Sequence, residues 1–327
     1  MTILVATKER LVLDTLLSSE DTELVTALDT GRIYEAISGT HLAIVDRHEL
    51  VEEPYSADLI VDLLANAGIT CCTSEEFIAD TDHYLDARSP SSRTLELPPK
   101  RTIAFTSYSG GTGKTSLALD TVLHFVNQTA RNLRLPAAIF ECVYGDSALE
   151  ALLGGEQVPL SLLLQQPELD PFKFRDVALY PMDYTNTRQI PNDQYRRYCR
   201  EQMANNVLTV IDTMWPHGHA LALGDDVDMW VVMTTPRIDA IENARKLQND
   251  LRERYGEEKV LLVVNQMGGF ASKLALMGLE RDIMLPRMQH ADTFFDGRLG
   301  KEILSRVYGP LWQQYEKRRR GLFRKRR

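Results

Sequence analysis

Short apolar runs alternate with helical patterns throughout the first 86 residues. We expect strands where a few apolar residues follow one another, and helices where apolar positions recur with the period of a helix. The expected strands are Ile3–Val5, Leu24–Leu28, His41–Val45 and Ile69–Cys72, and the expected helices are Glu9–Leu17, Arg32–Ile37 and a segment within Ala57–Ala67. This alternation predicts a small parallel α/β domain over residues 1–86.

Residues 87–100 contain three prolines and three serines and show no periodicity, which is typical of an exposed linker. Beyond them the apolar runs become nearly continuous. Thr102–Phe105 leads into a glycine-rich turn and a helix over Thr115–Phe125, and further runs follow at Ala137–Phe140, Val207–Ile211, Met229–Met233 and Val260–Val264. Such strands are covered on both faces, so residues 101–316 are expected to form a doubly wound, mainly parallel sheet.

The composition favours a soluble, cytoplasmic protein. The chain has 327 residues, of which 44% are hydrophobic and 25% charged, enough for one large domain and one smaller one. The start lacks the pattern of a secretory signal, and no apolar run reaches the roughly 18 residues of a membrane span. The four cysteines lack CxxC spacing, so we expect reduced, mostly buried thiols.

The charge is unevenly distributed. Residues 317–327, KRRRGLFRKRR, hold eight Lys or Arg and no acid, so the formal charge of −9 conceals a body eight units more acidic than the whole chain. An acidic body repels nucleic acid and anionic lipid. Any contact with either is therefore expected through this basic tail.

The turn after Thr102–Phe105 has the chemistry of a phosphate-binding loop. Its glycines, Gly110, Gly111 and Gly113, would let backbone N–H groups converge on phosphate oxygens, Lys114 would neutralise phosphate charge, and the Thr115 hydroxyl would ligate Mg²⁺. The predicted nucleotide-binding segment comprises Ser109, Gly110, Gly111, Thr112, Gly113, Lys114, Thr115 and Ser116.

This loop resembles the deviant KGGxGK[ST] motif of MinD/ParA-type ATPases. The resemblance implies ATP and Mg²⁺ as cofactors and a homodimer as the working form. In that family the first lysine of the motif reaches the nucleotide of the partner subunit, and here its position holds Ser109. Serine at this position predicts nucleotide binding with slow or absent hydrolysis. Lys114 is the candidate catalytic lysine, and the ATPase activity that it supports is expected to be weak at most.

Acidic residues follow two of the later apolar runs. The segment 137–154, AAIFECVYGDSALEALLG, resembles the DxDxxFGD segment of the TadZ/CpaE pilus-assembly proteins, which implies that Glu141 is the catalytic, water-positioning acid. A MinD-like register would instead place Val143 there and leave no base. Asp212 ends the run LTVID, where the family's acid holds Mg²⁺ through water.

The resemblance continues to the end of the predicted sheet. MWVVMTTPRIDAIENARKL at 229–247 is similar to the family's strand, TTP turn and helix. The resemblance also implies that Asn265, in VLLVVNQ, contacts the adenine and that Pro286, in IMLPRM, belongs to the loop that covers the adenine. His217 and His219 form an HxH pair without a third ligand, and we interpret them as surface residues of a switch loop.

The order of elements in residues 1–86 resembles a receiver domain with a flavodoxin-like fold, and Asp46 stands at the phosphoacceptor position. Phosphorylation also needs an acidic pair after the first strand, and this chain has Ala6-Thr7-Lys8-Glu9. We therefore interpret the domain as a degenerate receiver used for contacts or targeting, as in the TadZ/CpaE group.

These patterns lead to one main hypothesis and two alternatives. The main one is an ATP-binding localisation factor of a pilus or secretion machine. It would be cytoplasmic and held peripherally at the inner face of the membrane by residues 317–327. Each basic side chain of that segment contributes on the order of 1 kcal/mol of binding free energy near anionic lipid. The tail could instead bind nucleic acid phosphates or nothing. The alternatives are an active ParA-type ATPase that partitions DNA, and a regulator phosphorylated on Asp46.

Overall fold

The computed structural model describes residues 1–17, 22–86, 96–130, 133–154, 157–267, 276, 279–286 and 299–322. The chain divides into two compact units. Unit 1 comprises Met1–Pro99 with Thr129–Leu135 and Ala204–Asn206, and unit 2 comprises Lys100–Gln128, Pro136–Met203 and Val207–Arg327. The predicted linker lies mostly outside the described residues, which resume at Glu96.

Unit 1 is a parallel α/β layer. Its elements are β1 (Thr2–Ala6), α1 (Arg10–Leu17), β2 (Glu23–Thr26), α2 (Thr30–Ala36), β3 (Leu42–Val45), α3 (Ala57–Asn66), β4 (Thr70–Cys72), α4 (Ser74–Ala79) and α5 (Thr81–Asp86). The four strands are parallel in the order β2-β1-β3-β4. Helix α4 starts at a capping box in which Thr73 and Glu76 satisfy each other's backbone N–H groups, a local signal that fixes a helix start.

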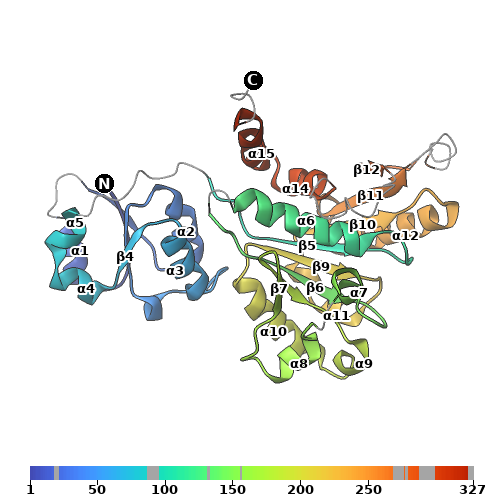
Figure 1. Ribbon diagram of the computed structural model, residues 1–327, viewed down its shortest axis with the longest axis horizontal. Coiled ribbons are helices and arrows are strands. Elements are labelled where there is room, and N and C mark those ends of the chain that lie inside the picture. The colour runs from blue at the N-terminus through green and yellow to red at the C-terminus, as the bar shows by residue number, and fades with distance from the viewer. Residues whose placement is uncertain are drawn as a thin grey trace. The chain divides into compact units, whose positions relative to one another are not determined.

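Unit 2 contains an eight-stranded sheet in the order β12-β11-β10-β5-β9-β6-β8-β7 (Figure 1). The strands are β5 (Arg101–Thr106), β6 (Ala137–Cys142), β7 (Phe172–Phe174), β8 (Val177–Tyr180), β9 (Leu208–Thr213), β10 (Met229–Thr234), β11 (Val260–Met267) and β12 (Ile283–Pro286). All pairings are parallel except that of β7 with β8. The predicted α/β fold with a mainly parallel sheet is thus confirmed.

The helices of unit 2 cover both faces of this sheet. They are α6 (Lys114–Thr129), α7 (Ala148–Leu153), α8 (Leu160–Gln165), α9 (Tyr184–Thr187), α10 (Asn192–Ala204), α11 (Gly218–Ala222), α12 (Ile238–Tyr255), α14 (Gly300–Tyr308) and α15 (Pro310–Leu322). The connection from β5 through α6 to β6 runs toward one edge of the sheet, and the connection from β10 through α12 to β11 runs toward the other edge. Because such crossovers are right-handed, α6 and α12 lie on opposite faces. The apolar stripe of α12 packs on β10 and β11 as part of the core.

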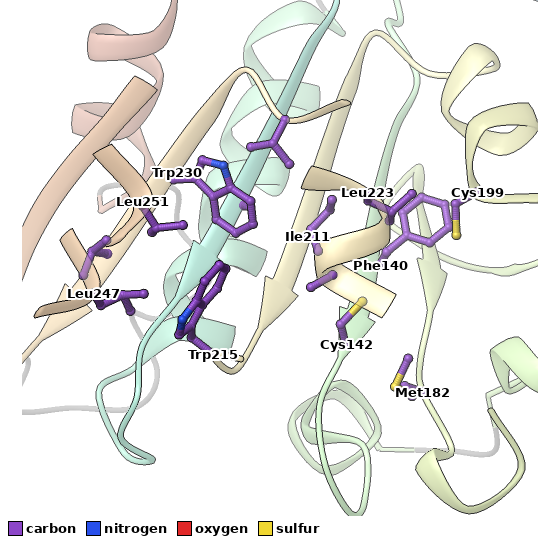
Figure 2. Close-up of a cluster of buried hydrophobic side chains, with 14 of the residues drawn as sticks. Phe140, Cys142, Met182, Cys199, Ile211, Trp215, Leu223, Trp230, Leu247 and Leu251 are labelled. Carbon is purple, nitrogen blue, oxygen red and sulfur yellow. The ribbon is translucent and has the colours of Figure 1, made fainter. Parts of the chain in front are cut away.

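One face of the sheet carries a cluster of large buried side chains (Figure 2). Trp215 and Trp230 meet edge to face with ring centroids 5.7 Å apart, and Leu247 and Leu251 of α12 close the cluster beside them. Aromatic pairs of this geometry add to the free energy of burial. Trp215 lies two residues after the end of β9, so this packing also fixes the start of a loop at the carboxyl edge of the sheet.

The C-terminal helices pack on α6. Phe125 of α6 stacks on Trp312 of α15 with ring centroids 5.6 Å apart, and the Asp120 carboxylate accepts hydrogen bonds from the backbone N–H groups of Leu299 and Gly300. Helix α15 continues through Leu322 and so extends beyond residue 316, the expected end of the domain, because Lys and Arg are good helix formers. None of the helices that the structure describes is long and apolar enough to cross a membrane.

Candidate functional site

The glycine-rich loop lies between β5 and α6, at the point in the sheet where the chain turns outward in opposite directions. Ligands of open α/β sheets bind at this kind of switch point, outside the carboxyl ends of the strands. Gly111 and Gly113 have φ angles of +69° and +83°, which favour glycine. Lys114 is the first residue of α6, so the positive end of that helix faces the loop.

Hydrogen bonds connect the residues of the loop to one another and to their surroundings. The Ser107 hydroxyl donates to the Ser109 carbonyl at 2.6 Å and lies 3.3 Å from the hydroxyl of Thr112. The N–H of Trp215 donates to the Ser107 carbonyl at 3.1 Å. The loop is therefore connected both to itself and to the segment that follows β9.

Lys114 and Asp212 are buried polar residues beside the loop, next to the half-buried Thr115. Lys114 is 8% exposed and Asp212 fully buried. Among the described residues, neither carboxylate oxygen of Asp212 has a partner at full hydrogen-bond geometry. Burial raises the pKa of Asp212, and the Lys114 charge and the Thr115 hydroxyl partly offset the rise. A buried carboxylate without full partners is costly, so the group is suited to receive a cation.

Glu141 lies beside Asp212, since the two are register partners on β6 and β9. Its Oε1 accepts hydrogen bonds from the N–H groups of Ala148 at 2.8 Å and Leu149 at 3.3 Å, and its Oε2 accepts one from Met182 at 3.2 Å. Burial raises the pKa of this carboxyl to about 7, although these hydrogen bonds oppose the rise. The carboxylate fastens the start of α7 to the end of β8.

The interpretation of His217 and His219 as surface residues is wrong. They are 1% and 6% exposed, because the segment after β9 turns inward and packs against aromatic rings. The His217 ring lies 4.6 Å from that of Tyr144 and 5.6 Å from that of His219, and the Tyr144 hydroxyl donates to the Pro216 carbonyl. Burial and the neighbouring His219 lower the pKa of His217 to about 4, so its ring is neutral near pH 7. The described residues contain no group of three or more metal-binding side chains.

The residues predicted to contact the base lie at the ends of the next two strands. Asn265 is near the end of β11, and its amide donates to the Thr112 carbonyl at 2.9 Å. Pro286 is the last residue of β12 and lines a cavity between that strand and α14. Gln266, which the sequence did not single out, donates from its amide to the Gly111 carbonyl at 3.5 Å. Only its place after Asn265 in the VVNQ run could have suggested it.

In unit 1, Asp46 is 7% exposed. Its carboxylate accepts a hydrogen bond of 2.5 Å from the Thr7 hydroxyl and one of 3.0 Å from the N–H of Ser74. Burial alone would raise the pKa of Asp46, but these hydrogen bonds lower it overall. Asp46 thereby ties the ends of β1 and β3 to the start of α4.

No family model and no curated protein matches the chain. Among solved structures, a ParA family ATPase from Chlorobium tepidum TLS matches with a TM-score of 0.50 and 13% identity, over 66% of this chain and 98% of the other. The septum site-determining protein MinD from Pyrococcus horikoshii OT3, complexed with Mg-ADP, matches with a TM-score of 0.50 and 15% identity, over 67% and 95%. At this identity the likeness shows the fold: an α/β domain with the mainly parallel sheet of MinD/ParA-type P-loop ATPases.

Proposed function

We propose that unit 2 binds ATP and uses it as a conformational switch in a localisation factor. One observation carries the proposal. A glycine loop held in shape by its own hydrogen bonds leads into α6, where the largely buried Lys114 adjoins the buried Asp212 carboxylate. Phosphate needs convergent N–H groups, a helix N-terminus and a cation, and these groups meet here.

The same residues fit a bound Mg²⁺. The Thr115 hydroxyl and the Asp212 carboxylate are the oxygen donors that this ion prefers, with Asp212 reaching it through water, and Asp212 lacks full partners among the described residues. When bound, the ion would neutralise charge on the β- and γ-phosphate oxygens. Lys114 would hold the phosphates in the orientation that the loop imposes.

Two features support slow or absent hydrolysis. Ser109, a short hydroxyl residue, cannot place a charge on phosphate in a second subunit. Glu141, the acid assigned to the attacking water, has both oxygens engaged by backbone N–H groups. A general base must be within hydrogen-bond reach of the proton it removes, so Glu141 would first have to release α7.

The finer assignment, to a TadZ/CpaE-like factor of a pilus or secretion machine, rests on the resemblance of segment 137–154 and on the α/β character of unit 1. On this proposal the nucleotide controls a homodimer, unit 1 contacts the machine, and the basic segment from Lys317 binds the anionic inner surface of the membrane.

Measurements of ATP affinity and steady-state turnover test this function. Wild type and Lys114→Ala are compared, each alone, with anionic liposomes and with DNA. We expect ATP binding that Lys114→Ala abolishes and little turnover in any condition. Binding that survives Lys114→Ala would refute the assigned site.

Each of the two alternatives predicts a different result. Turnover stimulated severalfold by DNA would replace the proposal with a ParA-type partitioning ATPase. Labelling by a small phosphodonor that is lost in Asp46→Ala would identify a phosphorylation-controlled regulator. The hydrogen bonds from Thr7 and Ser74 to Asp46 make such labelling the less expected outcome, because both carboxylate oxygens are already engaged.

A further inference from the structure

Strand β11 ends in a bulge beside the phosphate loop. Val264 pairs with Met284 and Met267 with Pro286, so two residues of β11, Asn265 and Gln266, stand opposite one residue of β12. Gln266 has a φ of +62°, a left-handed conformation that residues other than glycine rarely adopt and that is concentrated at functional sites. Bulges redirect side chains, and this one directs two adjacent amide side chains toward the loop.

Both amides donate to loop carbonyls. Asn265 Nδ2 lies 2.9 Å from the Thr112 carbonyl oxygen, and Gln266 Nε2 lies 3.5 Å from that of Gly111. Asn265 Oδ1 in turn accepts the N–H of Gln266 at 2.8 Å, which fixes the direction of the Asn265 side chain. The packing is close: a Cβ added to Gly113 would lie 2.4 Å from Asn265 Nδ2.

A peptide unit is planar, with its C=O and N–H pointing in opposite directions. A donor that holds the Thr112 carbonyl therefore fixes the N–H of Gly113 on the other side, and one that holds the Gly111 carbonyl fixes the N–H of Thr112. Phosphate binding to such a loop uses backbone N–H groups.

We propose that Asn265 and Gln266 are positioning residues that hold the phosphate loop from its outer side and so aim two of its N–H groups at the bound phosphates. The proposal rests on the proposed ATP binding. It adds a role for Gln266, and for Asn265 a role separate from contact with the adenine.

Phosphate and base contributions can be separated by using two ligands. ATP carries both groups, whereas inorganic tripolyphosphate carries only phosphate; each is measured with Mg²⁺ by displacement of a fluorescent ATP analogue. The variants are Asn265→Ala, Gln266→Ala and Gln266→Gly. The matched controls are the exposed residues Asn249 and Gln194, each replaced by Ala, together with Lys114→Ala. Thermal unfolding of every variant establishes that it is folded.

We expect Asn265→Ala and Gln266→Ala to weaken both ligands by about 3- to 10-fold, the range of one net hydrogen bond. Gln266→Gly should weaken binding as much as Gln266→Ala, although glycine suits the left-handed backbone better. A purely structural role for Gln266 predicts the opposite, namely full binding in Gln266→Gly.

Three other results would also overturn the proposal. Loss of ATP affinity with unchanged tripolyphosphate affinity would assign both residues to the base, and unchanged affinity for both ligands would show that the loop keeps its shape without them. If wild type binds ATP and Lys114→Ala does not, either result would refute this inference alone and leave the proposed ATP-binding function standing. Failure of the wild type to bind ATP would refute the proposed function and this inference together.

Discussion

Replacing Glu141 with Gln tests the buried carboxyl at the centre of the site. The side chain is fully buried and accepts three backbone hydrogen bonds. Gln is nearly the same size and keeps one acceptor oxygen, but it cannot ionise. The variant thus removes the titration of this group while nearly preserving the packing around α7.

The size and sign of the effect follow from the pKa of Glu141, which burial raises from the ordinary 4.5 to about 7. Between these two values the native state binds more protons than the unfolded state, so stability falls as pH rises. The stabilisation is fully present below pH 4.5 and is lost as pH rises through about 7. The stability lost over this pH range is about 3 kcal/mol, because each pKa unit corresponds to about 1.4 kcal/mol.

The free energy of unfolding is measured by urea unfolding of wild type and Glu141→Gln at a series of pH values from 4.5 to 8. The control is Glu168→Gln, which changes an exposed carboxyl. The stability of Glu141→Gln relative to wild type should rise by about 3 kcal/mol across the series, and that of the control should stay constant. Parallel curves for all three proteins would refute the reasoning. If Glu141 also positions water, the variant should lose whatever turnover the wild type has.

Three further predictions concern other parts of the molecule. Trp312→Ala should destabilise unit 2 by about 3–5 kcal/mol, measured by urea unfolding, because Trp312 is fully buried on Phe125; a change under about 1 kcal/mol would contradict this packing. Ser109→Lys introduces the lysine that the MinD/ParA-type motif carries at this position and should raise turnover severalfold, with dimers in ATP by light scattering; unchanged turnover would mean that this position does not limit hydrolysis. Asp46→Ala should cost about 1–3 kcal/mol by thermal unfolding, since it removes the acceptor of the Ser74 N–H, and an unchanged melting temperature would contradict that anchoring role.

Most strands were predictable from apolar runs, because a strand covered on both faces leaves an unbroken signal. The runs at Ala137–Phe140 and Met229–Met233, for example, became the core of β6 and β10. The short β7, β8 and β12 were missed. Strands β7 and β8 meet at a tight turn in which Arg175 and Asp176 both have positive φ, and neither residue gives the glycine signal by which such a turn is recognised.

The burial of His217 was also beyond the sequence. An HxH pair after a strand looks solvent-exposed, and only the packing of Tyr144 against the segment after β9 encloses it. The role of Glu141 has the same origin. The resemblance of segment 137–154 implied an acid that positions water at the nucleotide, but the N–H groups of Ala148, Leu149 and the more distant Met182 supply its hydrogen bonds.

The sequence by itself determined the α/β class of unit 2, the position of the phosphate loop between a strand and a helix, and the candidate residues for phosphate and Mg²⁺, because these depend on local periodicity and on glycine and charge at fixed spacing. The tertiary structure decided which polar groups are engaged: Glu141 by α7, Asp46 by Thr7, and the loop carbonyls by Asn265 and Gln266. Apart from the contact of Glu141 with α7, these contacts join residues far apart in the chain, and their geometry follows from strand register and a bulge, which no local pattern encodes.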